Sequence, residues 1–211
     1  MPAQRLAAIL LAFMLLFAAA RFVMQLGGGG VIELTEDVSR LENTLNSIAY
    51  THAKAVDESG EFAVYQVSFR TCPPCVQAHH KLLPKLAGAG LEPRMVTTAR
   101  RGTSTVDERA AVVENIRRKD WAFTQAWWKE NSPNGFYART DLVPIEEDSL
   151  RRAELETLQD HVSVLAEILK KNGKNFGFPA FFWRGQDGRY RAATGYNPAL
   201  TDIILADVRP Q

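Results

Sequence analysis

The sequence shows no excess of charge of either sign. It contains 25 Lys and Arg residues against 24 Asp and Glu residues, and 46% of its residues are hydrophobic. This balance is typical of an ordinary folded protein, and it argues against a nucleic-acid-binding protein and against a disordered tail. We therefore expect no nucleic-acid partner.

Cysteine is nearly absent. The 211 residues include only two cysteines, Cys72 and Cys75, and they are three positions apart. A chain of this length can bury a sizeable core without disulfides, so the pair is not needed as a scaffold. No internal repeat is present either, and the one low-complexity tract is the run of glycines at 27–30.

The N-terminal residues 1–26 are predicted to be a signal peptide or a membrane anchor. Arg5 precedes an apolar run, and Ala18 and Ala20 have the spacing of a signal cleavage site. If it is not cleaved, a helix over residues 6–26 would be about 30 Å long, enough to anchor the chain in the inner membrane. Both alternatives place the rest of the chain outside the cytoplasm, where thiols can be oxidised.

Residues 27–60 are predicted to form a glycine hinge and an amphipathic linker helix. The helix carries apolar residues at alternating spacings of three and four, among them Leu34, Leu41, Leu45 and Ile48. This stripe fits packing against the chain's own domain, and it also fits the seam of a parallel homodimer.

Residues 61–211 carry the pattern of an α/β domain. A strand over 61–69, a helix over 72–88 with a kink at Pro84, and a strand over 91–98 form a βαβ unit. A helical insertion follows at about 104–174, with one helix ending at Trp128 and a second ending at Gly173. The chain closes with a hairpin and a C-terminal helix that ends near Leu205.

The two cysteines have the spacing of a redox pair. Residues i and i+3 of a helix lie about 5 to 6 Å apart at Cβ, which allows Cys72 and Cys75 to form a disulfide. At the N-cap, the Cys72 sulfur would face unpaired backbone N–H groups and the positive end of the helix dipole, and both favour the thiolate. We therefore predict that Cys72 is the attacking residue and Cys75 the resolving one.

Pro73 and Pro74 belong to the same motif and limit how the Cys72 sulfur is stabilised. Neither proline has a backbone N–H, so the Cys75 amide is the one remaining donor among the residues that usually serve an N-cap acceptor.

A metal site is the main alternative use of this segment. Copper or zinc could be bound by the cluster Cys72, Cys75, His79 and His80. Zinc signatures usually supply a second, separate ligand pair, and elsewhere in the chain only His52 and His161 remain, so we expect no metal and no other cofactor. His79 and His80 are then predicted to be solvated helix residues.

Taken together, these segments resemble the catalytic domain of the DsbC/DsbG family of periplasmic disulfide isomerases. The resemblance spans about 62–208 and depends on the CPPC motif, on Trp127 and Trp128 in the insertion, and on the stretches GFPAFFWRGQDGR and ATGYNPALTDII. Two features depart from the family: the region before residue 61 is too short for its N-terminal dimerisation domain, and Phe178 occupies a position where the family usually has Thr or Val.

The resemblance implies a thioredoxin-like fold and a periplasmic thiol-disulfide oxidoreductase that acts on protein disulfides, as an isomerase or a reductase. It implies that Pro179 is cis and that Thr71, Phe178 and Pro179 contact the substrate. Its expected partners are disulfide-containing proteins and a membrane thiol-disulfide electron donor. A thioredoxin-fold adaptor of a secretion or conjugation apparatus is a further alternative, against which the intact CPPC motif argues.

Overall fold

A six-stranded sheet forms the centre of the protein. The structure, a computed structural model, describes residues 30–52, 62–129 and 142–208. The sheet order is β1-β6-β5-β3-β4-β2, in which β3 and β4 are parallel and the other neighbours are antiparallel. The strands are β1 (Ile32–Leu34), β2 (Thr51–His52), β3 (Ala63–Ser68), β4 (Glu92–Thr97), β5 (Ala180–Arg184) and β6 (Tyr190–Thr194).

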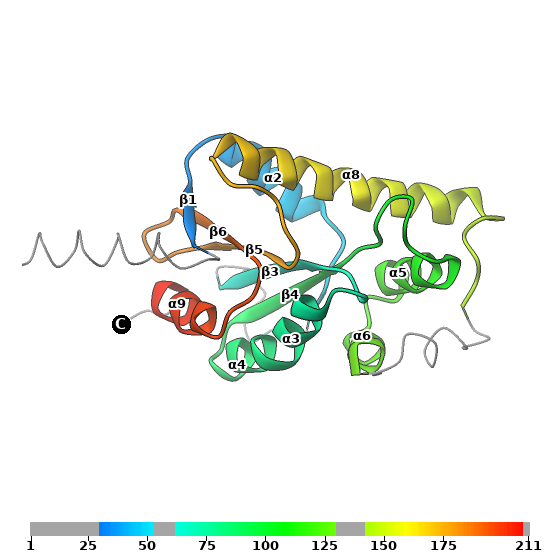
Figure 1. The fold of residues 1–211 in the computed structure, drawn as a ribbon, viewed down its shortest axis with the longest axis horizontal. Coiled ribbons are helices and arrows are strands. Elements are labelled where there is room, and N and C mark those ends of the chain that lie inside the picture. Colours follow the sequence, from blue (N-terminus) through cyan, green and yellow to red (C-terminus); the bar gives the residue numbers. More distant parts are fainter. Residues whose placement is uncertain (1–29, 53–61, 130–141, 209–211) are drawn as a thin grey trace, which may run out of the picture.

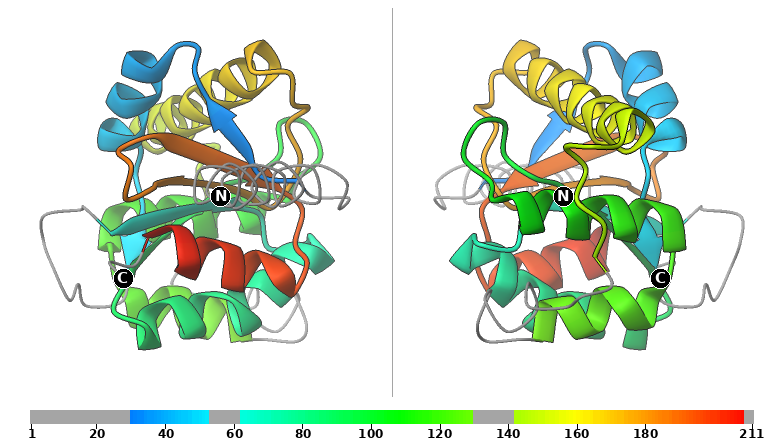
Figure 2. Two further views of the ribbon diagram at one scale, coloured as in Figure 1. Left: turned by 90° about the vertical axis from the view of Figure 1, so that its left-hand side faces the viewer. Right: turned by 90° about the vertical axis from the view of Figure 1, so that its right-hand side faces the viewer.

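Helices cover both faces of this sheet. Figures 1 and 2 show α3, α4 and α9 on one face and α2 and α8 on the other, with α5 and α6 at one end. The helices are α2 (Val38–Ser47), α3 (Pro73–Lys81), α4 (Leu83–Gly88), α5 (Val106–Arg118), α6 (Trp121–Lys129), α8 (Ser149–Lys171) and α9 (Ala199–Val208). The expected α/β fold is confirmed: a βαβ half, a helical insertion and a ββα half.

Strand β3 is the centre of the core. All six of its residues are buried, as expected for a strand covered on both faces. Its antiparallel neighbour β5 contributes Phe181, Phe182 and Trp183, none of them more than 1% exposed. The carboxyl end of β3 leads directly to Cys72, so a fully buried strand positions the cysteine pair.

The segment predicted as a glycine hinge and an amphipathic linker helix contains helix α2, and the strands on either side of this helix join the sheet. Strand β1 pairs with β6 and β2 pairs with β4, so the described part of this segment belongs to the sheet. Helix α2 packs on α8, where Arg40 pairs with Glu167 at 2.8 Å and Asp37 with Lys171 at 2.6 Å. The remaining residues of 27–60 lie outside the described residues, as do residues 1–26.

The prediction of a homodimer seam was wrong, and its alternative, packing of the stripe within the chain, is confirmed. Leu34, Leu41, Leu45 and Ile48 are at most 3% exposed because the chain's own core covers them. The same side chains cannot form a seam between two copies while they fill this core.

Two segments that were each predicted as a single helix form two helices in the structure. The kink expected at Pro84 is confirmed, since α3 ends at Lys81 and Pro84 lies in the first turn of α4. The single helix expected to end at Trp128 is instead α5 and α6. Lys119 adopts the left-handed conformation (φ 47°) that ends α5, and the Asp120 carboxylate accepts from the Ala122 N–H at 2.8 Å to begin α6. No helix within the described residues is long and apolar enough to cross a membrane.

Candidate active site

The start of helix α3 positions the Cys72 sulfur. Cys72 is the N-cap residue, with extended backbone (φ −97°, ψ 110°), and its Sγ accepts a hydrogen bond from the Cys75 backbone N–H at 3.4 Å. Pro73 and Pro74 occupy the first two helical positions and have no N–H. The prediction that the Cys75 amide would be the N-cap donor is confirmed.

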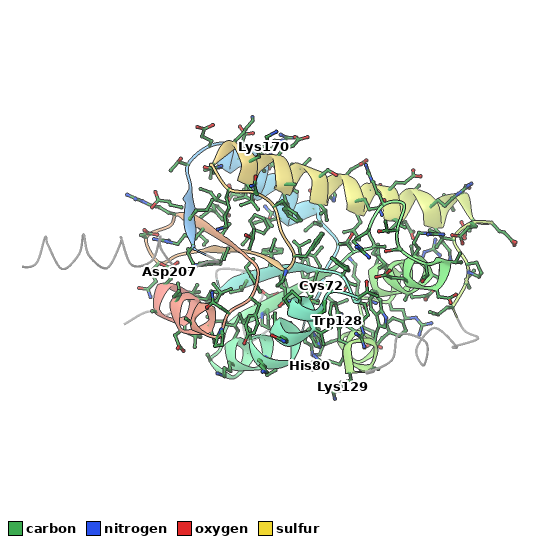
Figure 3. The ribbon with its side chains drawn as sticks, viewed as in Figure 1. Cys72, His80, Trp128, Lys129, Lys170 and Asp207 are labelled. Atoms are coloured by element: carbon green, nitrogen blue, oxygen red, sulfur yellow. The ribbon has the colours of Figure 1, made fainter. Side chains whose placement is uncertain are left out.

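The loop before β5 lies against the Cys72 sulfur. The Phe178–Pro179 peptide bond is cis, as expected, and the Phe178 carbonyl oxygen is 3.9 Å from Cys72 Sγ. Cys72 is 5% exposed, while Thr71 and Pro73 on either side of it are exposed. Figure 3 labels Cys72 at the N-terminal end of α3 and His80 farther along the same helix. The Cys72 sulfur is therefore nearly covered, with exposed residues on either side of it in sequence and the Phe178 carbonyl oxygen nearby.

The two free cysteines differ in their surroundings. Cys75 is fully buried, and burial, together with a hydrogen bond to Cys72, raises the pKa of the Cys75 thiol. Hydrogen bonds with the Phe69 backbone and with the Ser68 side chain act in the opposite direction on this pKa. The Gln66 side-chain amide in turn donates to the Ser68 hydroxyl at 2.8 Å, and both residues are buried on β3. A neutral polar pair therefore lies beneath the inner cysteine.

Aromatic rings surround the entrance to the site. The Phe178 ring packs edge-on against Phe69 at 4.9 Å and against Phe176 at 5.0 Å between centroids. The Arg100 guanidinium lies over the Phe69 ring, 4.7 Å from its centroid. The sequence analysis missed Phe69, Phe176 and Arg100. The position of Phe69 at the end of the strand before the cysteines was a local signal for it, but no local signal points to Arg100.

Thr71 has a polar partner on the insertion. Its hydroxyl lies 3.5 Å from Glu108 Oε1, in the first turn of α5. The Glu108 backbone N–H donates to the N-cap Thr105 hydroxyl at 3.1 Å, and the Glu108 side chain is almost fully buried. The helical insertion thus reaches the residue directly before Cys72.

The two histidines of the suspected metal cluster lie in different environments. His80 is exposed, as predicted, but His79 is 1% exposed and stacks on Trp128 at 5.1 Å. Burial lowers the pKa of His79 to about 3, with the charges of His80 and Arg70 acting in the same direction. Trp127 and Trp128 are also fully buried. Within the described residues, no three or more His, Cys, Asp or Glu side chains are grouped so as to hold a metal ion.

No protein-family model and no curated protein matches this chain. Among solved structures it is similar to Proteus mirabilis ScsC in a compact conformation, with a TM-score of 0.53, 14% identity, and coverage of 95% of this chain and 89% of that one. A linker-deletion mutant of the same protein gives a TM-score of 0.53 and 13% identity over 95% and 90% of the two chains.

A thioredoxin-like oxidoreductase from Silicibacter pomeroyi gives a lower TM-score of 0.44, with 17% identity over 68% of this chain and 84% of that one. At these identities the similarity concerns the fold alone. Together with the sheet order and the helical insertion, the similarity to the two ScsC structures defines the chain as a protein of thioredoxin-like fold.

Proposed function

We propose that the protein is a periplasmic thiol-disulfide oxidoreductase that acts on protein disulfides as an isomerase or a reductase. The observation that carries the proposal is the Cys72 sulfur at the N-cap of α3, 3.4 Å from the Cys75 amide and 3.9 Å from the carbonyl of Phe178. An N-cap sulfur is stabilised as a thiolate by the helix dipole and by this amide, and a thiolate attacks disulfides.

In the first step, the Cys72 thiolate attacks one sulfur of a substrate disulfide. A Cys72–substrate disulfide forms, the substrate disulfide breaks, and the second substrate sulfur leaves as a thiolate. Thr71, Phe178 and Pro179 are proposed to contact the substrate. Thr71 is the exposed residue before Cys72, the Phe178 carbonyl oxygen lies 3.9 Å from the Cys72 sulfur, and Pro179 follows Phe178 through the cis bond. The backbone of Phe178 would pair with the substrate strand.

The second step has two outcomes. In isomerisation, another substrate thiolate attacks the mixed disulfide, which frees Cys72 with no net transfer of electrons. In reduction, Cys75 loses its proton and attacks Cys72 Sγ, which releases the reduced substrate and leaves a Cys72–Cys75 disulfide. Two electrons from a membrane thiol-disulfide donor would then restore both thiols.

The proposed location depends on residues 1–26. These residues have the composition of an export signal or an inner-membrane anchor, and the disulfides of substrate proteins persist mainly in oxidising compartments outside the cytoplasm. The resemblance to DsbC/DsbG-type isomerases supports the isomerase or reductase direction over that of a primary oxidase.

The experiment is to trap the redox state of Cys72 and Cys75 in living cells by acid quenching and alkylation. We expect a mostly reduced pair, which an isomerase or reductase requires. A mostly oxidised pair would instead identify an oxidase. A pair whose state does not change when the cellular thiol-disulfide balance is changed would contradict the redox function as a whole.

A further inference from the structure

A groove beside the candidate active site is lined by arginines. It has a volume of about 560 Å³ and lies between the loop after β4, helix α5 and the first half of α8. Figure 1 shows this loop rising from β4 toward α8 before α5 begins. The charged side chains that line the groove are Arg100, Arg101, Arg109, Arg152, Glu146, Glu156 and Asp160.

Two of the four arginines are already paired. Arg101 forms an ion pair with Asp160, and Arg109 forms one with Glu146. Among the described residues, neither Arg100 nor Arg152 has a carboxylate within ion-pair distance, and both side chains are exposed. With Glu156 as the one acidic lining residue left unpaired, the groove retains a positive charge available to a ligand.

Arg100 connects the groove to the cysteine pair. Its guanidinium lies over the Phe69 ring, and that ring contacts Phe178, whose carbonyl oxygen is next to Cys72 Sγ. The Phe69 carbonyl oxygen also accepts from the Cys72 N–H at 3.2 Å. The backbone of Arg100 is fixed because its N–H donates to the buried Ser104 hydroxyl at 2.9 Å. Arg100 therefore presents a positioned cation at the edge of the surface where a substrate chain would lie.

We propose that Arg100, with Arg152 of the same groove, binds an acidic residue of the substrate polypeptide near the cysteine that Cys72 attacks. This inference rests on the proposed function and adds a preference among protein substrates. A guanidinium binds a carboxylate through two parallel hydrogen bonds, and stacking on an aromatic ring restricts its motion without neutralising its charge. Because both arginines are exposed, each contact contributes modestly.

The test compares two model peptides, each with one disulfide. They are identical except that three glutamates beside the reactive cysteine in the first are glutamines in the second. The measured quantity is the ratio of kcat/KM for the two peptides, which cancels any general change in activity. We expect the protein to prefer the glutamate peptide about fivefold, to lose most of this preference in Arg100→Gln, and to lose it at high salt. Lys170→Gln is the control, since it removes the same charge at the far end of α8 (Figure 3).

Equal rates on the two peptides would overturn the inference and leave the proposed function intact. An equal loss of preference in Arg100→Gln and Lys170→Gln would also overturn it, because the effect would then reflect net charge. If the protein reduces neither peptide, the proposed function fails and this inference fails with it.

Discussion

The titratable side chains of helix α3 lie in different surroundings at the start of the helix and further along it. At the start of the helix, Cys72 lies beside exposed residues and the Phe178 carbonyl. One and two turns further, Cys75 and His79 are covered by β3 and by the indole of Trp128, and burial shifts the pKa of each toward its neutral form. The comparison teaches that burial holds Cys75 and His79 in their neutral forms, so the inner part of this helix contributes no ion.

The largest expected effect comes from removing the outer sulfur. In Cys72→Ser the nucleophile is lost, so we expect catalysed reduction of a protein disulfide to fall to the uncatalysed rate. The measurement is turbidity or absorbance during disulfide reduction with a thiol as the recycling reductant. Full activity in Cys72→Ser would mean that Cys75, and not Cys72, is the attacking residue.

The second prediction concerns the reactivities of the two thiols in the reduced protein. With iodoacetamide at neutral pH, we expect Cys72 to be alkylated on the order of 100-fold faster than Cys75, because Cys75 is buried and its pKa is raised. Mass spectrometry of the labelled peptides gives both rates. The control is the denatured protein, in which the two rates should converge. Equal alkylation rates in the folded protein would show that Cys72 and Cys75 do not differ in reactivity.

The third prediction concerns the stability of the buried end of α3. The pKa of His79 is lowered from 6.5 to about 3 in the folded protein, so the unfolded state takes up its proton first as the pH falls. The stabilisation is therefore complete above pH 6.5 and is lost progressively as the pH falls toward 3. By pH 4.5 the loss is on the order of 2 to 3 kcal/mol.

His79→Phe should reduce the loss of stability between pH 7 and pH 4.5 by this amount. Urea unfolding at the two pH values measures it, and His161→Gln on α8 is the control variant. An unchanged pH dependence in His79→Phe would show that His79 is solvated, as the sequence analysis had expected.

The smallest effect is expected from Ser68→Ala. The Ser68 hydroxyl, held by the Gln66 amide, lowers the pKa of Cys75, so its loss should slow the attack of Cys75 on the mixed disulfide by about fivefold. The decay of a preformed mixed disulfide measures this step. The alkylation rate of Cys72 should not change, which separates this effect from a general distortion. Ser163→Ala, at an exposed serine of α8, is the control.

Much of this site could be predicted because it is local in sequence. Cys72, the two prolines and the Cys75 amide lie within one helical turn, and the strand before them has an unambiguous pattern. The position of the Phe178 carbonyl, next to the cis bond to Pro179, against the Cys72 sulfur required the family resemblance, since 106 positions separate Phe178 from Cys72.

The N-terminal segment and the surroundings of the site could not be predicted in the same way. The stripe on α2 is compatible with any apolar partner surface, and only the tertiary structure shows that this surface is on the same chain. Strands β1 and β2 have three and two residues, too few for a periodic pattern. His79 is buried because α6 packs over it, and its neighbours in sequence give no sign of this.

The measurement that tests the central claim most directly is the trapping of mixed disulfides by single-cysteine variants in cells. Cys75→Ala retains the attacking sulfur and loses the resolving one, so it should accumulate disulfide-linked partners that non-reducing gels display and reduction releases. Mass spectrometry should place the link at Cys72. Cys72→Ala should trap far fewer partners, because its remaining sulfur is buried. Equal trapping by the two variants, or trapping by Cys72→Ala alone, would contradict the account.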